Sequence, residues 1–128
     1  MFTKLSIIAL GGAFGALSRY GVSGLALKYL NPAFPFGTLI VNLVGSFLIG
    51  FFYQLFDQQA VSESTKGFIF AGFLGAFTTF STFSLDTVRL FQQGDTTAGL
   101  TNILINNVGG ILLVLLGIFL ARALFGGK

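Results

Sequence analysis

The sequence predicts an all-α membrane protein with four transmembrane helices, the third of which is broken near the middle of the bilayer. Of the 128 residues, 54% are hydrophobic and only 9% are charged. A soluble domain carries about a quarter charged residues, so this chain has too few charges to cover a surface that faces water. The broken helix is predicted by a stretch rich in hydroxyl groups, residues 75–84, "GAFTTFSTFS", which interrupts an otherwise apolar segment.

Four apolar segments carry the prediction of membrane spans. A helix that crosses a bilayer needs about 20 predominantly apolar residues. Four segments reach this length, and they form one transmembrane domain over the whole chain, residues 1–128. The expected spans are residues 4–30, 36–56, 67–90 and 98–124.

The connections between the spans carry turn signals. Both prolines lie in residues 30–37, "LNPAFPFG", which suits a turn followed by the start of a helix. Residues 57–66, "DQQAVSESTK", form the longest polar run. Residues 92–97, "QQGDTT", predict a Gly-Asp turn and a threonine cap for the last helix.

The first span has some features of a cleaved signal peptide, because Lys4 precedes an apolar stretch. Arg19 and the length of the segment beyond it fit a signal peptide poorly. The other three spans would stay in the membrane in either case.

The composition excludes several kinds of chemistry. The chain has no cysteine and no histidine, so we expect no thiol chemistry, no disulfide, no zinc site of the usual kind and no imidazole base. The net charge of +3 is too small to indicate nucleic-acid binding. A proton-coupled exporter would ordinarily place a carboxylate at the centre of a span. The carboxylates are Asp57, Glu63, Asp86 and Asp95, and no span carries one at its centre.

The cations give almost no preference for one orientation. With four spans, both termini and the middle loop share one side of the membrane. That side collects Lys4, Lys66, Arg122 and Lys128, and the other collects Arg19, Lys28 and Arg89. The excess of lysine and arginine on one side sets the orientation of a membrane protein. Because the two sides here are nearly equal, two interpretations stay open. Either the chain inserts both ways and pairs as an antiparallel two-fold dimer, or other features select one orientation, which the count itself slightly favours.

A dimer is expected on separate grounds. Four short helices enclose little interior, and small residues mark where membrane helices approach one another closely. Gly11 and Gly15 have the spacing typical of such contacts.

Polar side chains form stripes in two of the spans. Asn42 and Ser46 lie four residues apart in the second span. Asn102 and Asn106 have the same spacing in the fourth, so each pair shares one helical face, and Asn107 lies off it. An unpaired amide or hydroxyl in hydrocarbon costs roughly 2–7 kcal/mol. These groups therefore face each other, water or a ligand, and two stripes favour a lined pathway over isolated hydrogen bonds.

The hydroxyl-rich stretch indicates a break in the third helix. Gly75 and the pair Thr78 and Thr79 weaken a helix near its midpoint. Unwound backbone at that depth persists only where it is buried in protein or lines a cavity. A broken helix frees carbonyl groups that can bind a cation and hydroxyl groups that can bind an anion.

Phenylalanines and one arginine add to this picture. Phe77, Phe80 and Phe83 recur every three residues. An aromatic ring has a positive edge, so edges turned inward could meet an anion without formal charge, and plain packing is the alternative. Arg19 lies well within a span, where it would pair with another group, reach to the interface or attract anions to an entrance.

Three stretches resemble the small fluoride channels known as Fluc, or CrcB. They are residues 11–20, "GGAFGALSRY", residues 36–50, "FGTLIVNLVGSFLIG", and residues 72–84, "GFLGAFTTFSTFS". The similarity spans almost the whole chain. It implies a passive, fluoride-selective channel that exports fluoride from the cytoplasm across a prokaryotic inner membrane and relieves fluoride toxicity. It also implies an antiparallel, dual-topology homodimer with two pores and a sodium ion at its centre.

The resemblance implies roles for single residues. The backbone carbonyls of Gly75 and Thr78 would hold the sodium ion. Phe80 and Phe83 would face the pore, and Asn42 would be the pore asparagine of the second helix.

Further roles follow from the same resemblance. Ser81 and Thr82 would be the polar pair beside the ring edges, and Arg19 would match the arginine of the first helix, at a vestibule. Relatives carry a track of hydroxyls along the fourth helix, which Asn102 and Asn106 would occupy here. Amides can also donate hydrogen bonds, but this departure leaves the fourth-helix ligands open.

The expected partners are fluoride, sodium, a second copy of the chain and the lipid bilayer, with no nucleic acid. A small coupled transporter is the rival class, and the lack of a carboxylate at midspan argues against it. A membrane scaffold without transport is a third class. An enzyme is not expected, because no base, nucleophile or metal cluster stands out.

Overall fold

The computed structural model describes residues 1–126; Lys128, one of the cations counted above, lies outside them. All regular elements in this part of the chain are helices. Four helices are long and apolar enough to cross a membrane, which confirms the four predicted spans. Their bounds are Phe2–Tyr29, Phe36–Gln58, Glu63–Gln92 and Thr96–Phe125.

The first two spans are continuous helices joined by the predicted proline turn. Helix α1 (Phe2–Tyr29) ends where Leu30 becomes extended. In the turn, the side-chain oxygen of Asn31 accepts a hydrogen bond from the Ala33 amide at 2.9 Å. Pro35 directly precedes α2 (Phe36–Gln58), because a proline lacks the N–H that the first turn of a helix leaves unpaired.

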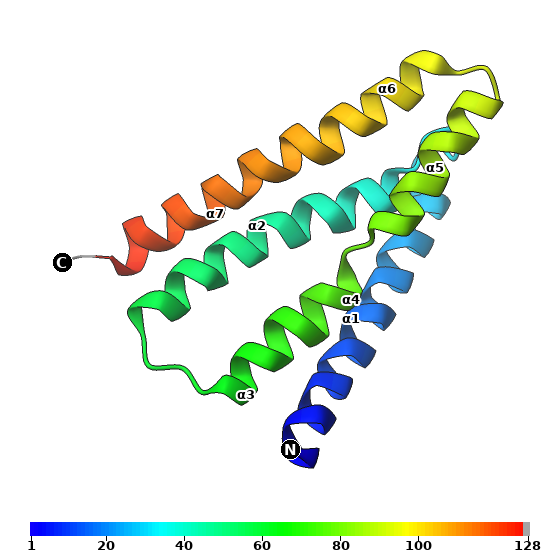
Figure 1. The fold of residues 1–128 in the computed structure, drawn as a ribbon. Coiled ribbons are helices and arrows are strands. Elements are labelled where there is room, and N and C mark those ends of the chain that lie inside the picture. The colour runs from blue at the N-terminus through cyan, green and yellow to red at the C-terminus, as the bar shows by residue number, and fades with distance from the viewer. Residues whose placement is uncertain (127–128) are drawn as a thin grey trace.

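The third span is divided into four pieces. They are α3 (Glu63–Lys66), the π-helical η1 (Gly67–Leu74), α4 (Gly75–Phe77) and α5 (Phe80–Gln92). The helix starts one turn earlier than predicted, because the Ser62 hydroxyl accepts a hydrogen bond from the Thr65 amide at 3.2 Å and caps it. Thr78 and Thr79 are extended, so the break lies where the sequence predicts it (Figure 1).

The fourth span consists of α6 (Thr96–Leu104), the π-helical η2 (Ile105–Gly109) and α7 (Gly110–Phe125). The predicted Gly-Asp turn is present, and Gly94 adopts a left-handed φ of 81° in it. The predicted threonine cap is wrong. Asp95 caps the helix instead, because its carboxylate stands one residue earlier and accepts a hydrogen bond from the Ala98 amide at 3.0 Å.

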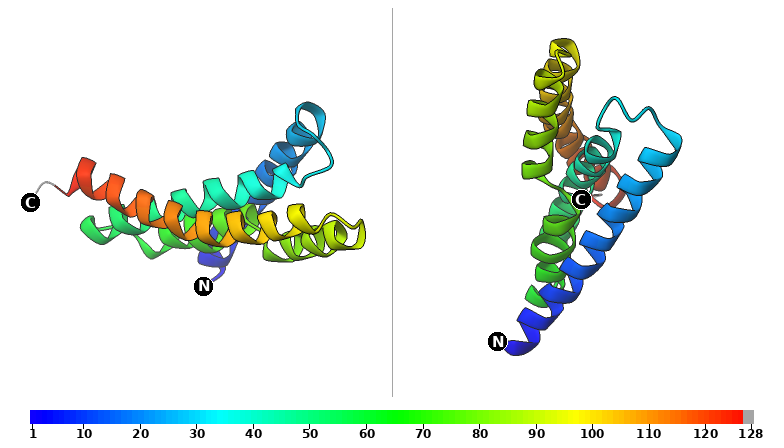
Figure 2. Two further views of the ribbon diagram at one scale, coloured as in Figure 1. Left: turned by 90° about the horizontal axis from the view of Figure 1, so that it is seen from above. Right: turned by 90° about the vertical axis from the view of Figure 1, so that its right-hand side faces the viewer.

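Helices α2 and α7 lie side by side along most of their length, as Figures 1 and 2 show. Glycines permit this approach. A Cβ atom at Gly50 would collide with the carbonyl oxygen of Val114, and one at Gly117 would collide with that of Phe47. We call this contact, defined by Gly50 and Gly117, the glycine seam.

A similar contact joins α1 to η1. A Cβ atom at Gly11 would collide with the Phe68 carbonyl oxygen, and one at Gly15 with the Phe73 carbonyl oxygen. The small-residue spacing seen in the sequence therefore serves a helix contact inside the chain.

The interior of the protomer is small. In Figure 2 the helices splay apart, and α1 diverges from the α6–α7 helix. The largest side chains that are fully buried are Val41 and Asn102. One of these two is polar, so the small interior contains a fully buried amide.

Candidate functional site

A cavity of about 340 Å³ lies beside the break in the third span. Parts of α2, the broken third span and η2 line it. Its polar lining residues are Asn42, Ser46, Thr78, Thr79, Asn106 and Asn107. No charged residue within the described chain lines this cavity, so any ion in it meets neutral dipoles only.

Asn42 holds the break in its extended shape. Its Oδ1 atom accepts a hydrogen bond from the Thr79 amide at 2.8 Å, and its Nδ2 atom donates to the Thr79 carbonyl oxygen at 3.1 Å. These two bonds replace the helical partners that Thr79 gives up. In a continuous α-helix the Thr79 amide would bond to the Gly75 carbonyl oxygen, so the side chain of Asn42 directly frees that carbonyl.

Two carbonyl groups at the break keep oxygen lone pairs for a ligand. The carbonyl oxygens of Gly75 and Thr78 accept no hydrogen bond from residues 1–126. Carbonyl oxygens are ligands that hard cations prefer. The donor chemistry therefore fits the sodium ion that the resemblance implies.

Arg19 lies at the break and outside the cavity lining. Its side chain is half-buried, and its Nε atom donates to the Ala76 carbonyl oxygen at 2.9 Å. Arg19 lies on α1, and it thereby supplies a hydrogen-bond donor to a third carbonyl group of the broken helix. The vestibule role that the resemblance implies for Arg19 stays a prediction.

Phe80 and Phe83 both line the cavity, but they differ in exposure. Their ring centroids are 5.6 Å apart and their planes are tilted by 55°. Phe83 is 8% exposed, whereas Phe80 is 78% exposed. One ring therefore belongs to the packed protomer, and the other projects away from it.

The hydroxyl groups of the break fall into two classes. The Thr78 hydroxyl donates to the Leu74 carbonyl oxygen at 2.9 Å and is thus occupied. The Thr82 hydroxyl accepts from the Thr79 hydroxyl at 3.1 Å, so its own proton stays available. Ser81 is exposed, and its hydroxyl makes no hydrogen bond within residues 1–126. Neither Ser81 nor Thr82 lines the cavity beside the break.

The two predicted polar stripes face each other. The Asn42 Nδ2 atom donates to the Asn106 Oδ1 atom at 3.0 Å. One turn further along, a Cβ atom at Gly110 would lie 3.3 Å from the Ser46 hydroxyl oxygen. Asn102 is fully buried and does not line the cavity.

The π-helical segment η2 changes the geometry that a regular helix would give. Asn107, which an α-helical pattern places off the stripe, lines the cavity together with Asn106. A π-helix takes more residues per turn than an α-helix, so two consecutive asparagines can reach the same cavity. The sequence pattern alone misses this, because it assumes a regular helix.

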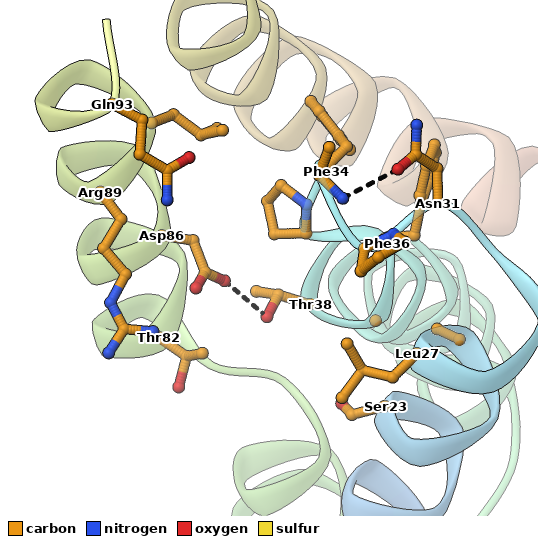
Figure 3. Close-up of a pocket in the computed structure, with 16 residues that line it drawn as sticks. Ser23, Leu27, Asn31, Phe34, Phe36, Thr38, Thr82, Asp86, Arg89 and Gln93 are labelled. Atoms are coloured by element: carbon orange, nitrogen blue, oxygen red, sulfur yellow. Dashed lines mark hydrogen bonds between the residues drawn. The ribbon is translucent and has the colours of Figure 1, made fainter. Parts of the chain in front are cut away.

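A second pocket, of about 360 Å³, lies between the proline turn and α5 (Figure 3). The Thr38 hydroxyl donates to the Asp86 Oδ2 atom across it at 2.9 Å. Arg89 and Thr82 line the same pocket. Since Thr82 is bonded to Thr79, which lines the first cavity, the two pockets flank the first turn of α5.

Sequence reasoning missed Thr87 as part of the site. Thr87 is buried, its hydroxyl donates to the Phe83 carbonyl oxygen at 2.8 Å, and it accepts from the Asn102 Nδ2 atom at 3.0 Å. The spacing contained a signal for it. Thr87 comes four residues after Phe83, an expected pore residue, and so shares its face of the helix.

Comparison with known proteins finds similarity over almost the whole chain. The family described as CrcB-like protein, Camphor Resistance (CrcB), matches residues 6–118. A protein of Salinibacter ruber named fluoride-specific ion channel FluC is 51% identical over 124 residues, which cover 97% of this chain and 93% of the relative. A protein of the same name from Dehalococcoides mccartyi is 47% identical and covers 94% of each chain. A third, from Legionella pneumophila, is 47% identical over 90% of this chain and 87% of the relative.

Proposed function

The chain belongs to the CrcB family, and from this membership we propose that it is a fluoride-selective ion channel. It lets fluoride leave the cytoplasm passively and so relieves fluoride toxicity. It is a multi-pass membrane protein and not an enzyme. One structural observation supports the proposal above the others: the cavity beside the broken helix is lined by neutral dipoles and no charge.

A neutral lining suits rapid conduction of a small anion. Fluoride is strongly hydrated, so a pore must replace the water that the ion loses. A charged site would bind the ion too tightly, whereas several weak sites allow entry and release. The hydroxyls of Ser81 and Thr82 have protons to offer, and Asn42 and Asn106 line the cavity. All four side chains are neutral groups whose chemistry includes hydrogen-bond donation.

The phenylalanine edges would supplement these donors. The edge of an aromatic ring is positive, and Phe80 and Phe83 are both cavity-lining residues. Within residues 1–126, Arg19 uses only its Nε atom, on the Ala76 carbonyl oxygen, so its remaining guanidinium N–H groups are left to draw anions toward a vestibule.

We propose that a second copy, inserted in the opposite orientation, completes the channel. In one protomer Phe80 is 78% exposed, and the Gly75 and Thr78 carbonyl oxygens have no hydrogen-bond donor within residues 1–126. Unpaired carbonyls are not stable against lipid. An antiparallel, dual-topology homodimer would cover them and, by its two-fold symmetry, would hold two equivalent pores.

The same carbonyls would hold a sodium ion where the two copies meet. Backbone carbonyl oxygens are neutral dipoles, so they can coordinate the cation without bringing a formal negative charge into the site. The ion would then fix the broken helices of both copies. The location that fits this assembly is the inner membrane of a prokaryote.

Fluoride efflux from liposomes tests the function. Purified protein is reconstituted, the vesicles are loaded with fluoride, and a fluoride electrode records efflux down the gradient without an imposed proton gradient. We expect fast fluoride efflux and little chloride efflux from matched vesicles.

The outcome separates the rival classes. Efflux only in the presence of a proton gradient would indicate a coupled transporter. No flux under any gradient would indicate a scaffold. Equal rates for chloride and fluoride would refute selectivity.

A further inference from the structure

The polar side chains that line the cavity beside the break differ in whether their protons are already in use. An anion is held by N–H and O–H groups that do not already donate to another acceptor. The Asn42 Nδ2 atom donates to the Thr79 carbonyl oxygen at 3.1 Å and to the Asn106 Oδ1 atom at 3.0 Å. The Asn106 Nδ2 atom donates to the backbone and side-chain oxygens of Asn102 at 2.9 and 3.0 Å. Both N–H groups of each amide are therefore used inside the protein.

The two threonine hydroxyls of the lining are in use as well. The Thr78 hydroxyl donates to the Leu74 carbonyl oxygen at 2.9 Å. The Thr79 hydroxyl donates to the Thr82 hydroxyl oxygen at 3.1 Å. Since a hydroxyl group has one proton, neither threonine has a proton left for a ligand.

The donors that remain in the lining belong to Ser46 and Asn107. Within residues 1–126, the Ser46 hydroxyl makes no hydrogen bond. The Asn107 Nδ2 atom donates to the Ile103 carbonyl oxygen at 2.7 Å. Because a carboxamide nitrogen carries two protons, one N–H group of Asn107 stays available.

The Ile103 carbonyl group fixes the orientation of the Asn107 amide. If the amide turned over, its Oδ1 atom would meet the Ile103 carbonyl oxygen, and two acceptors would face each other. The side chain reaches the cavity from η2, and Asn107 is exposed in the protomer. Asn107 therefore brings a nitrogen of fixed position, with one unused N–H group, to the cavity.

Gly110 leaves room beside the Ser46 hydroxyl. Ser46 comes four residues after Asn42, and Gly110 comes four residues after Asn106, so each lies one turn beyond an amide of the facing stripes. A Cβ atom at Gly110 would lie only 3.3 Å from the Ser46 hydroxyl oxygen. Any side chain at Gly110 would thus crowd the hydroxyl, whereas the glycine leaves it open.

Free donors at this depth of a membrane protein need an acceptor. An N–H or O–H group in hydrocarbon without a hydrogen bond is costly. Hydrogen bonds to an ionised acceptor are stronger than those between neutral groups. A small anion would therefore satisfy both groups, and the lining holds no charged side chain of the described residues that would compete for it.

We propose that Ser46 and Asn107 are the side chains that donate hydrogen bonds to fluoride in this cavity. Asn42 and Asn106, which the resemblance suggests as ligands, shape the cavity through their bonds within the protein. The inference rests on the fluoride-channel function proposed above and assigns its donors. Asn107 lies off the helical stripe, and the π-helical turn makes it a pore residue.

The test removes each free donor and compares the result with a matched control. Ser46→Ala deletes the hydroxyl, and Asn107→Leu deletes the amide at similar size. Ser84→Ala is the control for the first variant, because the Ser84 hydroxyl bonds to the Phe80 carbonyl oxygen at 3.0 Å and does not line the cavity. Thr101→Val is the control for the second, since Thr101 lies on the same span and outside the cavity lining.

We expect fluoride efflux from liposomes to fall about tenfold in each test variant, because each loses one hydrogen bond to a charged acceptor. Both controls are expected to stay within about twofold of the natural protein. Rates are normalised to monodisperse protein, so a folding defect does not count as lost flux. Natural flux in either folded test variant would overturn the proposal.

Light scattering separates an ion ligand from an assembly residue. If the free N–H group of Asn107 binds a second copy of the chain, Asn107→Leu will change the oligomeric state. We expect the oligomeric state of the natural protein, and a change would overturn the proposal.

A third readout does not depend on flux. The chain has five asparagines, so selective ¹⁵N labelling gives few side-chain NH₂ signals, and the signal missing from Asn107→Leu is that of Asn107. We expect sodium fluoride to shift this signal and sodium chloride to leave it in place. A shift of the Asn42 or Asn106 signal without one of Asn107 would overturn the proposal. If the natural protein passes no fluoride, the proposed function fails, and the Asn107 signal still decides whether this amide binds the ion.

Discussion

Two regions of this protein bring helices together in opposite ways. At the glycine seam, Gly50 and Gly117 remove side chains so that the backbones of α2 and α7 touch. At the break, Asn42 inserts a side chain and takes over both backbone groups of Thr79. At the glycine seam, the shape of the two backbones fixes how α2 and α7 pack. The second contact, at the break, is fixed by hydrogen bonds and leaves polar groups beside a cavity.

The difference shows where an ion can be handled in a membrane protein. Close contact between two backbones leaves no room for a ligand. It also tolerates few substitutions, because any added side chain pushes the helices apart. A hydrogen-bonded break keeps backbone groups satisfied while leaving other donors and acceptors available. The cavity lies at the break and not at the seam for this reason.

The largest expected effect comes from filling the glycine seam. Gly117→Leu would place a side chain where the Phe47 carbonyl oxygen lies, and overpacking costs about 1–3 kcal/mol or more. We expect little monodisperse protein in size-exclusion chromatography. Gly21→Leu is the control, because nothing lies within 4 Å of a Cβ atom there. Normal yield of Gly117→Leu would mean that the seam is not tight.

Removing the side chain that holds the break should come next. Asn42→Leu leaves the Thr79 amide and carbonyl without their partner, at about 1–3 kcal/mol for each buried group. We expect a lower midpoint of thermal unfolding and loss of fluoride flux. Ser46→Ala lies one turn away and removes a hydroxyl without a hydrogen bond within residues 1–126, so its midpoint should not change. Equal midpoints for both variants would contradict the role given to Asn42.

The two phenylalanines at the break separate the effect of packing from the effect of the ring edges. Phe80→Ile and Phe83→Ile keep apolar bulk and remove the positive ring edge. We expect both to stay folded and both to lower fluoride efflux from liposomes. Phe83→Ile should cost more stability in the protomer, at about 1 kcal/mol, because Phe83 is 8% exposed and Phe80 is 78% exposed. Unchanged flux in both variants would remove the ring edges from the mechanism.

The smallest effect is expected far from both regions. Gly94→Ala places a side chain on a residue with φ of 81°, which costs about 1 kcal/mol for an L residue. We expect a slightly lower unfolding midpoint and unchanged fluoride flux, because the turn touches neither the seam nor the cavity. A large loss of flux would show that the turn takes part in conduction.

The sequence predicts the parts of this protein that depend on local chemistry. Long apolar runs predict the four spans, and the Thr78 and Thr79 pair predicts the position of the break. The four-residue spacing of Asn42 and Ser46 predicts a polar face, and the structure confirms that this face meets the fourth span. These signals lie within one or two turns of helix, where neighbours in sequence are neighbours in space.

Other features were decided by contacts between distant segments. The Arg19 bond to Ala76 and the Thr38 bond to Asp86 join residues 57 and 48 positions apart, and no local pattern indicates either pairing. The cap at Asp95 and the π-helical turn that brings Asn107 to the cavity also departed from the expected pattern.

The order of residues along the chain is enough to specify four apolar spans and a polar, weakened stretch in the third of them. The packing of the helices is needed to place Asn102 behind Asn106 and to bring its amide nitrogen to the Thr87 hydroxyl. The reason is physical. Hydropathy and helix propensity act along the chain, whereas the partner of a buried amide depends on the crossing and rotation of helices, which all their contacts set together.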